Sequence, residues 1–338
     1  MPLPYRRRPV ATADGHALGL FRREADTQRA VGDRRPPVLL LPGLGANRFT
    51  FGLRPDAGLP ARLADAGWDV WLGELRGARS SSPPTSGPAR MAPQAKLAED
   101  VPALLAAVRE ATGATRVAVV GHSLGGLLAL LTAGRAPDGG SRDLAAIVTI
   151  CTPLFAAPPS TLGALGAGLV SGLARHLGGG LAGGVPVAPL ARAGRRVARF
   201  VAPASHFLPG GTSPDVLQDY FTHAVEDIPL AEAAALLGWR LRGELAVDAG
   251  APRGLTGWLG RVRVPVLSVA GNRDGVAPPA CTRRAFEAIG SPERRWLPVG
   301  RENGTQADYA HADVLLGTHA EADVIRPIVD FLAPFRAA

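Results

Sequence analysis

The chain has 338 residues, of which 46% are hydrophobic, and this is enough to bury a large core in one or two domains. Its formal net charge is +8, but nearly all of its basic residues are scattered arginines, and Lys96 is the only lysine. Because Arg6 to Arg8 is the only basic run, the charge does not predict a nucleic-acid-binding surface, and we expect no nucleic-acid partner.

The cysteine content and the apolar stretches bear on the cellular compartment. Cys151 and Cys281 lie in apolar or strand-edge contexts and indicate no disulfide framework, which is typical of a reducing compartment. No apolar segment of a secretory signal precedes Asp14, so we expect a cytoplasmic protein. The Gly/Ala/Leu-rich stretch 161–190 is too interrupted to span a membrane, and we expect it to offer an apolar surface for substrate or for transient lipid contact.

Strands and helices are predicted to alternate through the first 150 residues. Alternating apolar residues at 17–22 indicate an edge strand. Short apolar runs indicate four buried strands, at 38–41, 69–72, 117–120 and 145–150. Helical spacing is found at 60–66, at 94–111 and after Ser123. This order predicts an α/β fold with a mostly parallel sheet covered by helices on both faces.

The alternation stops at Thr152 and resumes near Arg263. The residues between are rich in Gly, Ala, Pro and Leu, with helical stretches such as 231–241 but no clear strand. We interpret 152–262 as a helical cap or lid inserted between two core segments, 1–151 and 263–338. In the second core segment we predict strands at 263–270 and 294–299, and helices at 280–289 and 320–332.

The pattern Gly121-x-Ser123-x-Gly125 stands between the strand 117–120 and an Ala/Leu-rich helix. This is the arrangement of a nucleophile elbow, where a strained turn holds the serine hydroxyl above the sheet and glycines avoid collisions with its neighbours. We predict that Ser123 is a catalytic nucleophile. The alternative is a glycine-rich turn that only packs strand against helix.

A serine nucleophile needs a base and a group that orients the base. Asp274 follows a late predicted strand, in a turn where an aspartate could also simply accept backbone hydrogen bonds. Five of the seven histidines are set aside by position: His16 near the start, His176, His206 and His223 in the cap, and His122 facing away beside the nucleophile. Of the remaining two, His311 follows the last strand and is preferred to His319.

The oxyanion of an acyl-transfer intermediate needs preorganised N–H donors. We assign the backbone N–H of Leu124, at the start of the elbow helix, and that of Leu44, in the loop after the first buried strand. No zinc-spaced Cys/His cluster, dinucleotide fingerprint or Walker lysine occurs, so we expect neither a cofactor nor a metal. The two cysteines are interpreted as small buried hydrophobic residues.

With these residues the chain resembles the α/β-hydrolase superfamily over essentially all of its length outside the cap. The stretches 63–77 and 311–317 resemble the acid-lipase branch, which includes gastric and lysosomal lipases, and its bacterial relatives. The second is similar to the segment in which that branch carries its catalytic histidine, which favours His311. The resemblance implies a Ser-Asp-His ester hydrolase that acts through an acyl-enzyme on an apolar ester, beneath a lid.

Three departures from the acid-lipase branch concern the substrate, and one of them is that the cap 152–262 shows no match to that branch. The loop 41–45 reads Leu-Pro-Gly-Leu-Gly instead of the more usual His-Gly start, and the elbow ends in Gly-Gly. Polyhydroxyalkanoate synthases carry Cys, and dehalogenases and epoxide hydrolases carry Asp, where this chain has Ser123, so these activities are disfavoured. Two alternatives to hydrolysis stay open: an acyltransferase with the same triad, and a ligand-binding protein of this fold without turnover.

Overall fold

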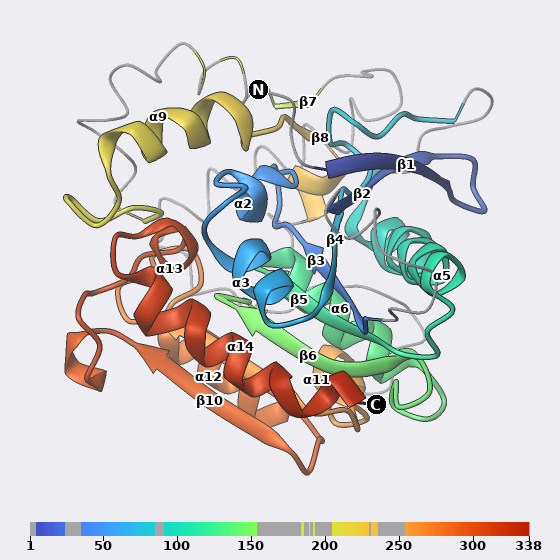
Figure 1. The fold of residues 1–338 in the computed structure, drawn as a ribbon. Helices are drawn as coiled ribbons and strands as arrows, with labels where there is room; N and C mark the ends of the chain where they lie inside the picture. Colours follow the sequence, from blue (N-terminus) through green and yellow to red (C-terminus); the bar gives the residue numbers. More distant parts are fainter. Residues whose placement is uncertain are drawn as a thin grey trace.

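The computed structural model describes residues 5–23, 35–84, 91–153, 205–229, 231–235 and 254–337, together with 184, 185, 189 and 192. At its centre is an eight-stranded sheet with the order β1-β2-β4-β3-β5-β6-β9-β10 (Figure 1). The strands from β4 to β10 run parallel to their neighbours, whereas β1 pairs with β2, and β2 with β4, in antiparallel fashion. The predicted α/β architecture is confirmed.

The sheet contains every core strand that the sequence predicts and one more. Its strands are β1 (Tyr5–Ala11), β2 (Ala17–Arg23), β3 (Pro37–Leu41), β4 (Asp69–Gly73), β5 (Val117–His122), β6 (Leu144–Ile150), β9 (Val266–Gly271) and β10 (Arg294–Val299). The additional strand is β1, whose residues 6–9 are all exposed, so that no alternation marks it in the sequence. Arginines and a proline on an outer strand discourage pairing with other chains.

Helices cover both faces of the sheet because successive residues of each inner strand point to opposite sides. Leu39 and Leu41 of β3 enter one apolar cluster, and Val38 and Leu40 enter the other. The first cluster lies under α5 (Val101–Thr112), α6 (Leu124–Arg135), α11 (Gly254–Leu259) and α12 (Pro279–Ala288). The second lies under α2 (Phe49–Gly52), α3 (Leu59–Asp65), α13 (Asp313–Leu316) and α14 (Arg326–Leu332).

Two predicted helices contain a π-helical turn. In the first, α4 (Pro93–Ala95) leads through the turn η1 (Lys96–Asp100) into α5, and in the second, η3 (Glu321–Ile325) leads into α14. A proline, Pro102 or Pro327, stands just after each turn. Proline lacks an N–H and its ring opposes the carbonyl one turn earlier, so a wider turn is a way to accommodate it. The shorter 3-10 segments are η2 (Arg301–Asn303) and η4 (Ala333–Ala337).

Only parts of the range predicted as a cap lie among the described residues. The helices and strands of these parts are β7 (Gly184–Val185), α9 (Pro214–His223), β8 (Ile228–Pro229), the helical residues 231–235, and α11. The antiparallel pair β7–β8 departs from the expected absence of strands in this range. Most of the apolar stretch 161–190 falls outside the described residues, and the limits of the cap stay a prediction.

The part of the cap around α9 contacts the core directly. Phe207, Leu217 and Tyr220 form a small apolar cluster with Ala312 of the core. Residue Val225 pairs with Ala46 in an isolated β-bridge, so the segment after α9 lies beside the loop that follows β3. Within the described residues, the helices are all too short or too polar to cross a lipid bilayer.

Candidate active site

Ser123 occupies the turn between β5 and α6 in a backbone conformation that non-glycine residues rarely adopt. Its φ is 53° and its ψ is −121°, and the residue is 7% exposed. Its N–H donates to the carbonyl of Ile150, while its own carbonyl accepts from the N–H of Gly126. The strain expected of a nucleophile elbow is therefore present at this serine.

The elbow glycines are required by close backbone contacts. A Cβ on Gly121 would lie 2.2 Å from the Gly126 nitrogen, and one on Gly125 would lie 2.3 Å from the Leu41 carbonyl oxygen. Real Cβ atoms essentially never approach within 3.0 Å. The helix α6 can thus start directly against β3 and β5 only because these positions carry no side chain.

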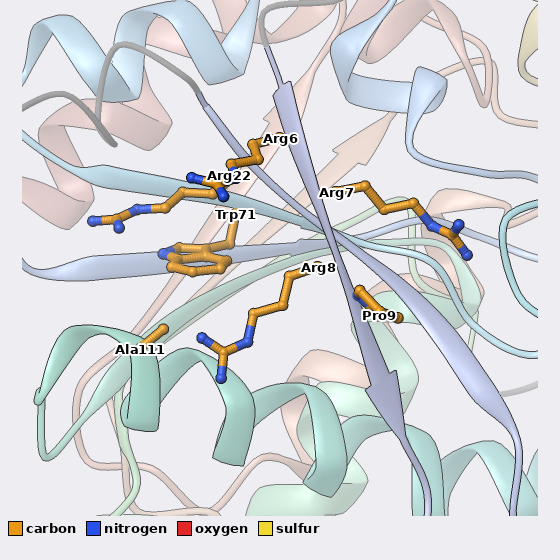
Figure 2. Close-up of a pocket in the computed structure, with 7 residues that line it drawn as sticks. All are labelled: Arg6, Arg7, Arg8, Pro9, Arg22, Trp71 and Ala111. Carbon is orange, nitrogen blue, oxygen red and sulfur yellow. The ribbon is translucent and has the colours of Figure 1, made fainter.

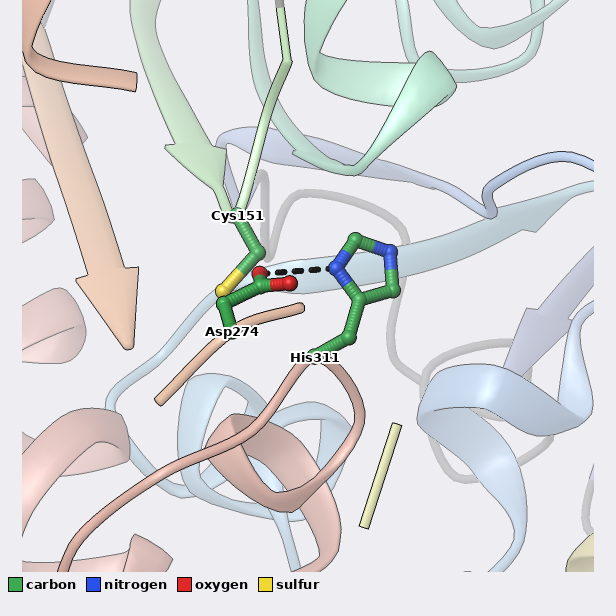
Figure 3. Close-up of side chains that lie close together, drawn as sticks. All are labelled: Cys151, Asp274 and His311. Atoms are coloured by element: carbon green, nitrogen blue, oxygen red, sulfur yellow. Dashed lines mark hydrogen bonds and ion pairs between the residues drawn. The ribbon is translucent and has the colours of Figure 1, made fainter. Parts of the chain in front are cut away.

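Asp274 and His311 form a buried hydrogen-bonded pair. The His311 Nδ1–H donates to Asp274 Oδ2 at 2.8 Å, and both residues are 4% exposed (Figure 3). Asp274 Oδ1 accepts the N–H groups of Val276 and Ala277 at 2.8 and 2.7 Å. Burial alone would raise the pKa of Asp274, but the hydrogen bond and charge of His311 outweigh it and hold that pKa below its ordinary value.

The loop that carries His311 is fixed against the elbow through His122. The His122 Nε2–H donates to the His311 carbonyl at 2.9 Å, and the two rings have centroids 4.7 Å apart. Burial, together with the His311 charge, lowers the pKa of His122 to about 3, so this imidazole is neutral. The expectation that His122 faces away is wrong, because its ring packs on His311. His319 lies on the surface.

The cap contributes a third histidine to this cluster. The ring of His206 packs edge-on against His311 with centroids 5.6 Å apart, and its Nδ1 is 2.9 Å from Ser205 Oγ. Burial and the His311 charge lower the pKa of His206 to about 4. The carbonyl oxygens of Ser205 and His206 accept N–H groups from Gly275 and Ala312. Residues 205–206 of the cap therefore hold both loops that carry the Asp-His pair. Their position in the sequence does not predict this contact.

A buried aspartate, Asp313, ties the cap to the same loop. Its carboxylate accepts the Thr212 hydroxyl at 2.6 Å and the Leu208 N–H at 2.7 Å. Asp313 also accepts the N–H of Ala310, just before His311. The aspartate thus orders the loop that carries His311.

Cys151 stands at the end of β6, against the Asp-His pair. It is fully buried and has a φ of 49°, in the left-handed region that side chains disfavour. Its sulfur lies within 4.8 Å of a carboxylate oxygen of Asp274. Burial and the charge of Asp274 raise the thiol pKa well above its ordinary value, so the sulfur keeps its proton. The sequence correctly predicts that Cys151 is buried, but it does not predict that the sulfur lies near the Asp-His pair.

The two residues assigned to the oxyanion hole flank Ser123. Leu124 is the first residue of α6, and Leu44 follows Gly43, where a Cβ would lie 3.0 Å from Ser123 Cβ. The Gly45 carbonyl accepts the Glu226 N–H, and the Asn47 side chain donates to Glu226 Oε1 at 2.6 Å. The loop after β3 is thus held over the serine by the segment that follows α9.

One surface cavity lies away from the candidate catalytic residues. It measures about 520 Å³ and lies where β1, β2 and β4 meet the end of α5, lined by arginines and Trp71 (Figure 2). None of the candidate catalytic residues lines it. Arg22 makes two hydrogen bonds to Asp69 there, and Arg8 pairs with Glu110. Arg22 and Arg8 thus take part in structural ion pairs at this cavity.

The fold is similar to that of known α/β hydrolases. Residues 36–175 match the sequence profile of the α/β hydrolase fold family. The structure superposes on a thermophilic esterase from Thermogutta terrifontis with a TM-score of 0.59 and 19% identity, covering 98% of this chain and 99% of that one. At this identity the likeness concerns the fold, and it confirms the predicted α/β-hydrolase fold.

Proteins named as lipases are among the sequence relatives of this chain. Lipase 3 of Drosophila melanogaster is 30% identical over 142 residues, which are 40% of this chain and 36% of that protein. Gastric triacylglycerol lipase of Rattus norvegicus is 33% identical over 131 residues, 36% of this chain and 33% of that lipase. The matches span about a third of the length of these relatives. The resemblance to the acid-lipase branch is confirmed.

Proposed function

We propose that this chain, an α/β-hydrolase-fold relative of the acid lipases, is a serine-dependent carboxylic-ester hydrolase. The observation that carries the proposal is the buried hydrogen bond from His311 Nδ1 to Asp274, in a loop fixed to the turn that strains Ser123. Because Nδ1 is engaged by the carboxylate, Nε2 is the ring nitrogen left to accept a proton from the serine hydroxyl.

In the first half-reaction, Ser123 Oγ attacks the ester carbonyl carbon while His311 Nε2 takes its proton. The tetrahedral oxyanion accepts hydrogen bonds from the Leu44 and Leu124 N–H groups, each contributing about 3 kcal/mol. The imidazolium then protonates the leaving alcohol, which departs as the acyl-enzyme forms. Asp274 fixes the imidazole tautomer and stabilises its positive charge, in keeping with its lowered pKa.

In the second half-reaction, His311 takes a proton from water, which attacks the acyl carbon. Collapse of this second intermediate breaks the bond to Ser123, and His311 returns the proton to the serine oxygen. The products are one carboxylic acid and one alcohol for each water consumed.

The substrate we propose is an ester with an apolar acyl chain. In support, the described part of the cap brings Phe207, Tyr220 and Phe221 together as packed rings beside Ala312, next to the base. The sequence relatives carry the names of lipases. An acyl chain that packs against this apolar cluster would gain about 0.8 kcal/mol for each methylene it buries.

The test combines a fluorophosphonate probe with p-nitrophenyl esters from acetate to palmitate. Wild type should become labelled and hydrolyse the series with an optimum above acetate, and Ser123→Ala should lose both. The exposed Ser141 supplies a control, since Ser141→Ala should behave as wild type. Equal labelling of Ser123→Ala and wild type would refute the assignment. Added alcohol or thiol acceptors reveal an acyltransferase if esters of the acceptor replace free acid.

A further inference from the structure

Three potential metal ligands converge at the Asp-His pair. One donor atom each from Cys151, Asp274 and His311 lies within 4.8 Å of the others. Figure 3 shows the sulfur and the carboxylate gathered on the Nδ1 side of the imidazole ring. The residues come from three separate positions, the end of β6, the turn after β9 and the loop before α13. No sequence spacing marks such a set, which is why no metal site is expected from the sequence.

The composition and size of the cluster suit a borderline-soft cation. Zinc is bound by thiolate, imidazole and carboxylate, with bond lengths of about 2.0 to 2.3 Å, so tetrahedral coordination separates its ligands by about 3.3 to 3.7 Å. The closest pair here, His311 Nδ1 and Asp274 Oδ2, is 2.8 Å apart, and the widest separation is within 4.8 Å. Side-chain adjustments of about 1 Å therefore bring all three donors onto one ion.

The surroundings of the three residues already orient them as ligands. The backbone of Cys151 is fixed by its N–H, which donates to the Val269 carbonyl at 2.9 Å. Two backbone N–H groups hold Asp274 Oδ1, so Oδ2 is the oxygen that faces His311. The His311 carbonyl is fixed by His122. Partners of this kind behind the ligands typically change metal affinity by about 10- to 100-fold.

We propose that Cys151, Asp274 and His311 form an inhibitory binding site for a divalent borderline-soft cation such as Zn²⁺. On binding, the Cys151 thiol loses its proton to solvent, and one thiolate and one carboxylate balance the two charges of the ion. The ion takes the lone pair of His311 Nδ1, so the ring proton resides on Nε2. The serine hydroxyl then has no proton acceptor.

Metal binding rests on the geometry alone, whereas inhibition rests also on the proposed ester hydrolysis. Loss of a general base costs about 10²- to 10⁴-fold in rate, so saturating Zn²⁺ should lower kcat/KM by at least about 100-fold. Because Cys151 is 0% exposed and its partners are 4% exposed, we expect the effect to develop slowly during preincubation. A chelator should restore the activity.

The first experiment measures binding without substrate. The purified chain is titrated with Co²⁺, which reports thiolate ligation by a near-ultraviolet charge-transfer band. We expect one Co²⁺ per chain and the band in wild type and in Cys281→Ala, which removes the chain's other, partly exposed cysteine. The band should be absent in Cys151→Ala and in the near-isosteric Cys151→Ser, with circular dichroism used to establish that each variant is folded.

The second experiment repeats the titration with Zn²⁺ and follows ester hydrolysis. Wild type and Cys281→Ala should be inhibited, and Cys151→Ser should lose most of its sensitivity. A wild type that shows no cobalt band, or a band equally strong in Cys151→Ser, would overturn the proposal. If wild type binds Co²⁺ but never hydrolyses an ester, the proposed function fails while the metal site stands.

Discussion

Replacing Gly125 by alanine should damage the active site without touching a reacting group. The new methyl carbon would lie 2.3 Å from the Leu41 carbonyl oxygen and 2.7 Å from that of Pro42. Ordinary contact begins at 3.4 Å, so α6 and the end of β3 must separate by 3.4 − 2.3, about 1.1 Å. Both contacts are with backbone, which cannot rotate away as a side chain could.

This displacement separates Ser123, at the start of α6, from Leu44, which follows Pro42. Misplacing catalytic groups by about 1 Å can cost about 10²-fold, so we expect kcat/KM for p-nitrophenyl butyrate to fall by about that factor. The forced repacking should also lower the unfolding free energy by about 1 to 3 kcal/mol.

Gly260 offers the matched control, because a Cβ there meets nothing nearer than the Thr256 carbonyl oxygen at 3.5 Å. Gly260→Ala should keep wild-type kcat/KM and stability in urea. The prediction is wrong if Gly125→Ala keeps kcat/KM within about threefold of wild type and unfolds at the same urea concentration as the wild type. That outcome would mean that the loop after β3 moves without consequence and that Leu44 is not a donor to the oxyanion.

Further predictions concern the buried charges. Lys96 donates to both oxygens of Glu232 at 2.6 and 2.7 Å. Lys96→Met alone should therefore lower the unfolding free energy in urea by about 3 to 5 kcal/mol, and adding Glu232→Leu should recover most of that loss. An equal loss of stability in the single and the double variant would contradict this prediction. The pKa of His122 is lowered from 6.5 to about 3, so its stabilising contribution is complete above pH 6.5 and is lost as the pH falls toward 3. The unfolding free energy of the wild type should therefore drop by up to about 3 kcal/mol between pH 6.5 and 4. His122→Gln should show a smaller drop over the same range. A wild-type unfolding free energy that does not change between these pH values would rule out this contribution of His122. Asp274→Asn should lower kcat about 10⁴-fold in ester hydrolysis, because the amide holds the wrong imidazole tautomer, and near-normal turnover would exclude the role of Asp274.

Local patterns were enough to predict most of the sheet. Buried strands such as β3 and β5 are continuous apolar runs because helices cover both of their faces, and a short apolar run between turns is visible without tertiary information. The strand β1 was not predicted, since it lies at the edge with residues 6–9 exposed. The π-helical turns were not predicted either, although Pro102 and Pro327 mark both places.

Some residues of the candidate site could be nominated from the sequence, and others could not. Chain order and loop position were sufficient to nominate Asp274 and His311, and the structure brings this pair together, while the catalytic roles of the two residues and of Ser123 stay predictions. His206 and Cys151 could not be nominated. Their positions beside His311 and Asp274 depend on how the cap and the end of β6 pack, and this packing leaves no periodic signal in the sequence.

The burial of Lys96 has a practical consequence for studying how the cap moves. This side chain is the only lysine amine in the chain, it is 4% exposed, and it ends in an ion pair with the helical residues 231–235. An amine-selective reagent therefore finds no accessible lysine in the folded chain. Acylation of Lys96 under native conditions should proceed only from molecules in which that helix has separated from the core, so its rate measures the free energy of that opening at one residue.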